Sequence, residues 1–404
     1  MAGLDETVDR AGGRFELSPA DPAFVQDPYP AYQRMRGAGQ AFFWQDYGLC
    51  CLPGFAEVDA AMRDRRFGRE PPFGREFPQH LAPFYAFESR SMLELEPPKH
   101  TRLRRLVNRA FVSREVERLR PRLEQFAHER IDGFGETFEL IDEFAAPLAV
   151  TMIAELLGTP VECSARMLDW SHGMVAMYEF GRDRVAEENA VRATLEFSAF
   201  MQEHIDQRRK QPADDLITRL VAVEEEGRGL TSDELVTTCI LLMNAGHEAT
   251  VHAIANGVKA LIENGIDPLP HLGDPASARL AVDELLRFDA PLHMFTRYAN
   301  EDFGFAGLSL RKGQEIGLLL GSANRDPLRF ADPDKLDLSR DQGGHMSFGA
   351  GIHFCVGAPL ARLEIEVAIR VLFERLGMPC LAERPVYADR YHFHGLERLL
   401  LTRG

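Results

Sequence analysis

The chain has 404 residues, with 46 Lys or Arg against 62 Asp or Glu, and therefore a formal net charge of −16. This balance argues against a nucleic-acid-binding protein and against docking on anionic membranes, because both require a basic surface. The six cysteines include no CxxC pair, which excludes a disulfide framework and a zinc ribbon. Since the N-terminus lacks a signal-peptide pattern and no apolar run reaches about 18 residues, we expect a cytoplasmic protein.

The predicted elements change in character along the chain. The N-terminal part combines a proline-rich segment at 18–30, a short helix from residue 32, strand-like residues at 41–52, a helix at 55–64 and an irregular segment at 67–87. Helices then dominate, at 100–111, 114–132, 144–157, 183–209, 215–225, 232–264, 275–288 and 358–376. Short strands are expected at 137–140, 295–301, 303–311 and 314–318. The pattern predicts a mainly α fold with small β-sheets, and its length alone suggests two or three domains.

The most informative stretch is FGAGIHFCVG, from Phe348 to Gly357. Its three glycines permit a tight turn, and Cys355 stands at the start of a helical run, where the helix dipole stabilises a thiolate. A dinucleotide-binding fingerprint is excluded because Phe354 replaces its third glycine. His353 is too close in sequence to act as the base of a nucleophilic cysteine. On spacing alone, a metal-binding cysteine and a buried structural cysteine fit equally well.

The spacing Phe348-xx-Gly351-xxx-Cys355-x-Gly357 resembles the haem-binding loop of the cytochrome P-450 family. The resemblance implies haem b as cofactor, with the Cys355 thiolate as axial iron ligand whose electron donation favours O–O cleavage. It also implies that Phe348 packs near the sulfur, and that the backbone N–H groups after Cys355 tune the iron. The implied fold is the cytochrome P-450 fold, a single domain over 1–404 with the haem between a distal helix (232–264) and the Cys355 loop.

Further motifs follow in the order that the family requires. Glu284 and Arg287, three residues apart, share a helix face; alone they fit a surface ion pair, whereas the resemblance makes them the buried pair of the ExxR motif. His100 and Arg104, four apart, fit either a solvated basic helix or a haem-binding face. The resemblance assigns the haem propionates to His100, Arg104, Arg297 and His353.

A near-match to the zinc motif HExxH occurs in the long apolar helix. His247 and Glu248 begin it, but the position of the second histidine holds Val251. His252 lies about 140° from His247 around the helix, so these two cannot share a metal as in zinc proteases. We therefore reject the zinc-site interpretation of this motif.

The same helix resembles the oxygen-side helix of the family through its AGHE run. The resemblance implies that Ala245 and Gly246 leave room for oxygen and that Glu248 relays protons. The family usually continues with threonine, but this chain has Ala249 followed by Thr250. A shift of one residue rotates a side chain by about 100°, so Thr250 is not a simple substitute. We expect ordered waters and a substrate hydroxyl to complete the relay, as inferred for the minority of members with alanine; poor coupling or an unusual oxidant is the alternative.

Several apolar side chains are candidates for the substrate pocket. Each alone fits core packing, whereas together they predict an apolar, aromatic-rich pocket for a terpenoid, steroid, polyketide or fatty-acyl compound. The candidates are Phe84, Tyr85, Phe87, Met177, Met243, Leu292, His293 and Phe393.

The resemblance predicts a monomeric monooxygenase that inserts one oxygen atom of O2 by hydroxylation or epoxidation. Because no residues remain for a fused reductase, a separate ferredoxin and ferredoxin reductase are expected as partners. The basic stretch 99–122 carries a net charge of +7, and we expect Arg102, Arg105 and Arg109 to face outward and steer an acidic ferredoxin; a solvated basic face is the alternative. One alternative is a peroxide-driven peroxygenase, and the presence of Glu248 argues against it. Another is a non-enzymatic haem binder, and both Glu248 and the distal groove argue against that.

Overall fold

The computed structural model describes residues 13–404 except 109–110, 112, 180 and 226–229. Its helices are α2 (Pro22–Gln26), α3 (Tyr29–Gly37), α4 (Phe55–Arg63), α5 (Ala82–Glu88), α6 (Lys99–Asn108), α7 (Ser113–Glu117), α8 (Arg120–Asp132), α9 (Ala146–Leu157), α10 (Ser164–Val175), α11 (Arg184–Lys210), α12 (Leu216–Glu225), α13 (Ser232–Asn264), α14 (Pro275–Phe288), α15 (Leu320–Ala323) and α16 (Ala358–Leu376). Its strands are β1 (Arg14–Phe15), β2 (Phe42–Trp44), β3 (Leu49–Leu52), β4 (Phe67–Gly68), β5 (Thr137–Glu139), β6 (Met294–Ala299), β7 (Phe303–Phe305), β8 (Leu308–Leu310), β9 (Glu315–Leu319), β10 (Cys380–Leu381), β11 (Val386–Tyr387), β12 (Leu396–Arg398) and β13 (Leu400–Thr402).

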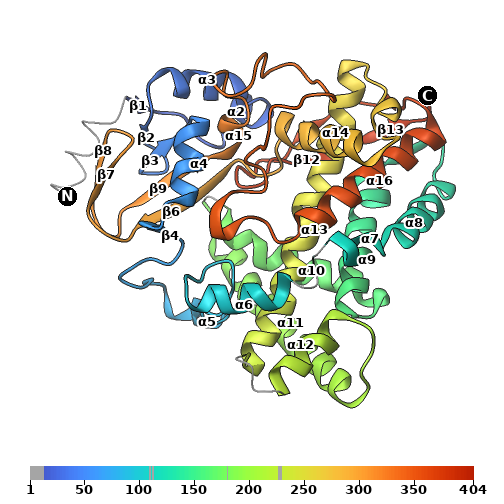
Figure 1. Ribbon diagram of the computed structural model, residues 1–404, viewed down its shortest axis with the longest axis horizontal. Helices are drawn as coiled ribbons and strands as arrows, with labels where there is room; N and C mark the ends of the chain where they lie inside the picture. The colour runs from blue at the N-terminus through green and yellow to red at the C-terminus, as the bar shows by residue number, and fades with distance from the viewer. Residues whose placement is uncertain (1–12, 109–110, 112, 180, 226–229) are drawn as a thin grey trace.

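The largest sheet joins N-terminal strands to β6 and β9, which lie more than 200 residues later in the chain. Its six strands follow the order β1-β2-β3-β9-β6-β4, and it lies on the opposite side of the molecule from α11 and α12 (Figure 1). Strands β3 and β9 are parallel, with Cys50 opposite Ile316, while β6 and β9 are antiparallel, with Arg297 opposite Ile316. The three small sheets are β10-β13-β5, β11-β12 and β7-β8. The sheet therefore holds Arg297 on an interior strand.

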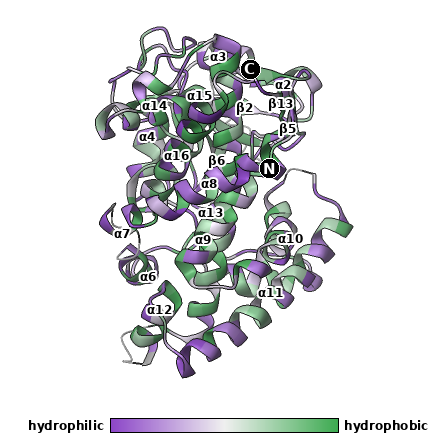
Figure 2. Cartoon of the chain, turned by 90° about the vertical axis from the view of Figure 1, so that its right-hand side faces the viewer, coloured by the Kyte–Doolittle hydropathy of each residue, from purple (hydrophilic) through white to green (hydrophobic). Residues whose placement is uncertain are grey.

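Helix α13 is the central element of the helical part. It begins with a capping box, in which Thr231 and Glu234 satisfy each other's backbone N–H groups, and ends at Gly265 in the left-handed conformation. It contacts α9, α10, α11, α14 and α16, and most of its residues are buried. Figure 2 shows green hydrophobic residues gathered along α13 and α9, while α11 and α12 at the periphery alternate green and purple, as amphipathic helices do.

The interior glycine of α13 has a packing reason. A Cβ placed on Gly246 would lie 2.7 Å from Cγ1 and 3.0 Å from Cδ1 of Ile153 on α9. Ile153 is only 1% exposed, so its side chain lies inside the protein. Gly246 therefore lets α9 and α13 approach closely, and α13 runs as one uninterrupted α-helix past it.

The predicted fold class and most predicted elements are confirmed. The expected bounds of α13, α14 and α16 coincide with the observed ones. The helix expected over 114–132 is instead two helices, because Pro121 in the first turn of α8 starts a new helix. The segment 67–87, expected to be irregular, contains β4 and most of α5, and α10 was not predicted. Among the described residues, every helix is too short or too polar to cross a bilayer.

Candidate active site

A cavity of about 280 Å³ lies between α13 and the loop that carries Cys355. Residues from distant parts of the chain form its wall. They come from α5 and α6, from β6, and from His392 and Phe393 near the C-terminus. Most of the residues predicted for the site line it: Phe84, Phe87, His100, Arg104, Ala245, Gly246, Glu248, Ala249, Thr250, Leu292, Arg297, Phe348, His353, Cys355, Gly357 and Phe393. Polar groups that the sequence did not single out, including Glu88, His392 and Glu364, line it as well.

Four predicted pocket residues lie elsewhere. Tyr85 stacks on Phe77, with ring centroids 4.5 Å apart, and Met177 is buried in the helical core. Met243 precedes Ala245 by two residues, which turns its side chain about 200° away, into the same core. His293 has 0% exposure, and its Nδ1 lies 2.7 Å from the Tyr32 hydroxyl.

The position of His293 has a simple cause. The preceding residue, Leu292, forms a β-bridge with Phe393 and lines the cavity. Successive side chains of an extended segment point to opposite sides, so His293 points away from the cavity.

The Cys355 loop is held by its own backbone. The Cys355 N–H donates to the Phe348 carbonyl at 2.9 Å, and the Arg362 guanidinium covers the Phe348 ring at 4.6 Å. Gly351 does not line the cavity. Two other features require a glycine there: its φ is 70°, and a Cβ at this position would lie only 2.2 Å from the carbonyl oxygen of Met62. Its role is thus to let the loop pack against α4.

Cys355 lines the cavity, so its sulfur can coordinate a metal bound there. Burial raises the pKa of the Cys355 thiol, whereas the Gly357 and Ala358 N–H groups and the Arg104 charge oppose that rise. With a haem bound, Cys355 would be the thiolate ligand, and the backbone N–H groups of Gly357 and Ala358 would stabilise its charge.

Two buried groups on the cavity wall have no acidic partner. Arg297 is 4% exposed, and its guanidinium donates to the Thr296 carbonyl at 2.8 Å, but none of the described carboxylates lies within 4.0 Å of it. Burial lowers the pKa of Arg297 to about 9. Both ring nitrogens of His100, which is 3% exposed, also lack a hydrogen-bond partner in the described part of the chain.

These unpartnered donors fit a cofactor with two carboxylates, such as the propionates of haem. The ring of His353 lies 4.4 Å from that of His100, with its Nε2 3.2 Å from Glu96. The Arg104 guanidinium donates to the Phe354 carbonyl at 2.6 Å and so links α6 to the Cys355 loop. The residues present therefore fit a haem whose propionates lie among Arg297, His100, His353 and Arg104.

The predicted ion pair on α14 is present and buried. Arg287 donates to Glu284 through Nε at 2.6 Å and Nη2 at 2.9 Å, with 2% and 3% exposure of the two residues. Arg340 adds a bond to Glu284 at 3.0 Å, and Arg287 also donates to the carbonyls of Asn324 and Pro333. A network with so many satisfied members fixes the chain that leads to the Cys355 loop.

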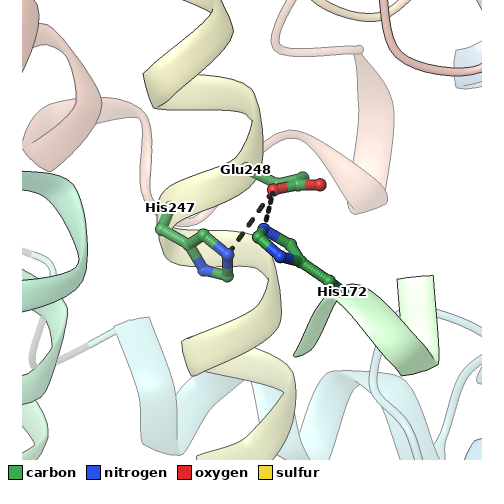
Figure 3. A group of neighbouring side chains, drawn as sticks. All are labelled: His172, His247 and Glu248. Carbon is green, nitrogen blue, oxygen red and sulfur yellow. Dashed lines mark ion pairs between the residues drawn. The ribbon is translucent and has the colours of Figure 1, made fainter. Parts of the chain in front are cut away.

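Glu248 is a buried acid at the edge of the cavity. Its Oε2 lies 3.3 Å from Nε2 of His172 and 3.5 Å from Nε2 of His247 (Figure 3). Burial by itself raises the pKa of Glu248, but the His172 hydrogen bond and the histidine charges outweigh it and lower the pKa to about 2. The carboxylate is therefore ionised and only weakly basic while His172 donates to it. The sequence did not indicate His172, because it lies on α10, far from Glu248 along the chain.

The two residues after Glu248 differ in surroundings. Ala249 lines the cavity but offers no hydroxyl. Thr250 lies beside the Glu364 carboxyl on α16; burial raises the pKa of Glu364 well above its ordinary value, and Thr250 only partly opposes this. Both carboxylate oxygens of Glu364 lack a hydrogen-bond partner in the described part of the chain, so Thr250 does not satisfy them.

The predicted cationic surface is smaller than expected. Arg105 is exposed, but Arg102 forms an ion pair with Glu234 in the first turn of α13. The expectation of a free outward charge at Arg102 is therefore wrong, because α13 supplies an acid beside it. Arg109 lies outside the described residues.

The fold and the cavity define a haem-thiolate protein, and known proteins agree. Residues 278–385 match the family Cytochrome P-450. A biotin biosynthesis cytochrome P-450 of Bacillus subtilis is 33% identical over 390 residues, covering 95% of this chain and 98% of the relative. The 6-deoxyerythronolide B hydroxylase of Saccharopolyspora erythraea is 35% identical over 371 residues, covering 87% and 89%. The solved structure of an epothilone D-bound cytochrome P-450, EpoK, has a TM-score of 0.90, 29% identity, and coverage of 96% and 99%.

The chain belongs to the cytochrome P-450 family and is a monooxygenase whose haem has a cysteine thiolate as axial ligand. When bound, the haem supplies the iron at which dioxygen is activated. Arg297 and His100 would hold the cofactor's carboxylates, and the apolar wall would exclude water. Glu248 places an ionised carboxylate at the edge of the cavity.

Proposed function

We propose that this monooxygenase hydroxylates or epoxidises a lipophilic small molecule of the terpenoid, steroid, polyketide or fatty-acyl class. The observation that carries the proposal is the apolar lining of the cavity between Glu248 and Cys355. The side chains that provide this lining are Phe84, Phe87, Met174, Leu241, Leu292, Phe295 and Phe393. Two similar proteins have lipophilic molecules in their names: the hydroxylase of 6-deoxyerythronolide B, and cytochrome P-450 BioI, solved with a hexadecenoyl acyl carrier protein. Screening such compounds for a shift in the haem spin state, followed by product analysis, tests the class; binding of polar compounds alone would contradict it.

Glu248 is proposed to take protons to the oxygen side, with ordered waters and a substrate hydroxyl standing in for the missing threonine. Two observations support this role: the buried Glu248 carboxylate lines the cavity, and the neighbouring Ala249 offers no hydroxyl there. Glu248→Gln is expected to slow product formation by about 10²-fold or more. Ala249→Thr is expected to change product per NADH consumed by less than about twofold. A large rise in that ratio would show that no substitute relay operates.

Electrons are proposed to come from a separate ferredoxin with its reductase, docking beside the Cys355 loop. On this loop, Ile352 is 44% and Phe354 39% exposed. The bond from Arg104 to the Phe354 carbonyl brings α6, and with it the exposed Arg105, to the same place. An apolar patch next to a cation suits an acidic protein that must approach the haem.

The test of this docking surface is a charge reversal at Arg105. Arg105→Glu is expected to slow reduction by an acidic ferredoxin about threefold to tenfold at low salt, with the difference shrinking as salt rises. Arg311→Glu, which reverses a charge with 67% side-chain exposure next to β8, serves as the control. If ferredoxin reduces both variants at equal rates at all salt concentrations, Arg105 belongs to a solvated basic face and not to a docking surface. Turnover with hydrogen peroxide but none with ferredoxin would favour a peroxygenase.

Residues 1–404 are proposed to act as a single haem domain. The cavity wall draws on residues from Arg69 to Phe393, so almost the whole chain contributes to one site. Haem release and loss of helical circular dichroism are expected to coincide in one unfolding transition; two separated transitions would contradict this.

A further inference from the structure

Three potential metal ligands meet at the solvent edge of the oxygen-side helix. His172 comes from α10, while His247 and Glu248 are adjacent on α13, and Figure 3 shows both imidazoles directed at the same carboxylate. The Glu248 Oε2 lies 3.3 Å from Nε2 of His172 and 3.5 Å from Nε2 of His247, and the three ligand atoms all lie within 4.8 Å of one another. In a tetrahedral zinc site with bonds of about 2.0–2.1 Å, ligand atoms are about 3.3–3.4 Å apart. The two separations from Glu248 therefore need little adjustment, and the two imidazole nitrogens would have to lie at a similar distance from each other.

The imidazole of His247 is poised as a ligand. Its Nδ1 lies 2.9 Å from the Met243 carbonyl and donates to it, which leaves the lone pair on Nε2. A metal-bound histidine commonly donates its other N–H to a backbone carbonyl in this way. His247 is 1% exposed, and its Nε2 has no hydrogen-bond partner in the described part of the chain.

This unpartnered nitrogen faces the Glu248 carboxylate, and both groups are acceptors. Two acceptors at 3.5 Å do not attract each other unless a cation or a proton lies between them. Either a bound cation or a proton on Nε2 of His247 would join these two groups, and zinc binding distinguishes the first from the second.

We propose that His172, His247 and Glu248 bind a zinc-class divalent ion, with the fourth position open to water. Two imidazoles and one carboxylate suit Zn2+, whereas Mg2+ and Ca2+ prefer oxygen ligands only. The ion has a route from solvent, because the His172 side chain is 54% exposed in front of the buried pair. The site differs from HExxH, in which the glutamate is a general base: here the Glu248 carboxylate is itself a ligand, and α10 supplies the second histidine.

Binding there has a consequence for turnover that rests on the proposed role of Glu248. An ion coordinated by the carboxylate removes it as a proton acceptor, so zinc is expected to inhibit the monooxygenase. Zinc binding at this site and inhibition of turnover by zinc can be measured separately in one experiment.

The experiment uses untagged, haem-loaded enzyme treated with a chelator, then dialysed against Zn2+ with an excess of Mg2+. Zinc and iron are measured by mass spectrometry, and product formation is followed in parallel. The wild type is expected to bind one zinc per haem at this site, and His172→Ala or Glu248→Gln to weaken that binding by at least about tenfold. His172 is exposed, so His172→Ala is expected to fold, which its unchanged haem spectrum checks.

The matched control is His80→Ala. Nε2 of His80 lies 2.7 Å from Glu187, a histidine–glutamate pair to which the described residues add no second histidine. This variant is expected to bind zinc like the wild type. Zinc binding that is unchanged in His172→Ala, or reduced equally in His80→Ala, would overturn the site. Binding that depends on His172 without slowing product formation would support the site and contradict the proton role of Glu248.

Discussion

The glycine inside α13 allows a test of how the oxygen-side helix is built. Gly246→Ala adds one methyl group 2.7 Å from Cγ1 of Ile153, which is closer than real side chains pack. Overpacking of a rigid core costs about 1–3 kcal/mol. The gain in helix propensity from glycine to alanine is up to about 1 kcal/mol. We therefore expect Gly246→Ala to lower the free energy of unfolding by about 1–2 kcal/mol.

A second glycine on the same helix provides the control. A Cβ on Gly257 would meet Ile369 at 3.4 Å and Leu285 at 3.5 Å, which are ordinary contacts. Gly257→Ala is therefore expected to stabilise the protein by up to about 1 kcal/mol. The two variants should shift the urea midpoint of the haem-loaded enzyme in opposite directions.

A double variant identifies the clashing partner. Ile153→Ala alone leaves a cavity and is expected to cost about 2–5 kcal/mol. In the Gly246→Ala background the new methyl group fills part of that space, so the cost should fall by about 1 kcal/mol or more. If Gly246→Ala is as stable as the wild type, or if the two changes are additive, close packing of α9 is not the reason for this glycine.

Two further predictions concern buried acids. Arg287→Met removes the principal partner of buried Glu284 and is expected to lower the free energy of unfolding by about 3–5 kcal/mol in urea denaturation; a loss below about 1 kcal/mol would show that Arg340 compensates. Burial, reinforced by the charge of Glu94, raises the pKa of Glu88 from 4.5 to about 8. Its stabilisation is therefore complete below about pH 4.5 and is lost as the pH rises through about 8. Glu88→Gln, which can still accept from the Tyr178 hydroxyl, should flatten the fall in melting temperature over that range, and an unchanged profile would refute the assignment.

The sequence predicted those parts of the fold that depend on local signals. The bounds of α13 were predictable because Thr231 and Glu234 form a capping box and Gly265 ends the helix. The Cys355 loop was recognisable because its glycines and cysteine lie within ten residues. Helix α10 lacks such a signal, and its buried Ser171 and interior Gly173 interrupt the apolar period.

Tertiary neighbours decided the rest. His172 became part of the site only because α10 packs on α13, and Arg102 lost its free charge to Glu234 for a similar reason. His293 was predicted to line the cavity together with Leu292. Side chains alternate along an extended segment, so only Leu292 faces the cavity. The pairings of His172 with Glu248 and of Arg102 with Glu234 join residues that are far apart in sequence, so composition and periodicity do not predict them.

The central claim is that Cys355 is the thiolate ligand of a haem iron. The most direct measurement is the difference spectrum of the reduced enzyme with carbon monoxide, recorded for the wild type, Cys355→Ser and Cys380→Ser, with haem content measured in each. Cys380 is an exposed free cysteine and serves as the control. The wild type and Cys380→Ser are expected to show the red-shifted band of thiolate ligation, and Cys355→Ser to lose it. A wild type without that band, or a Cys355→Ser variant that keeps it, would contradict the account.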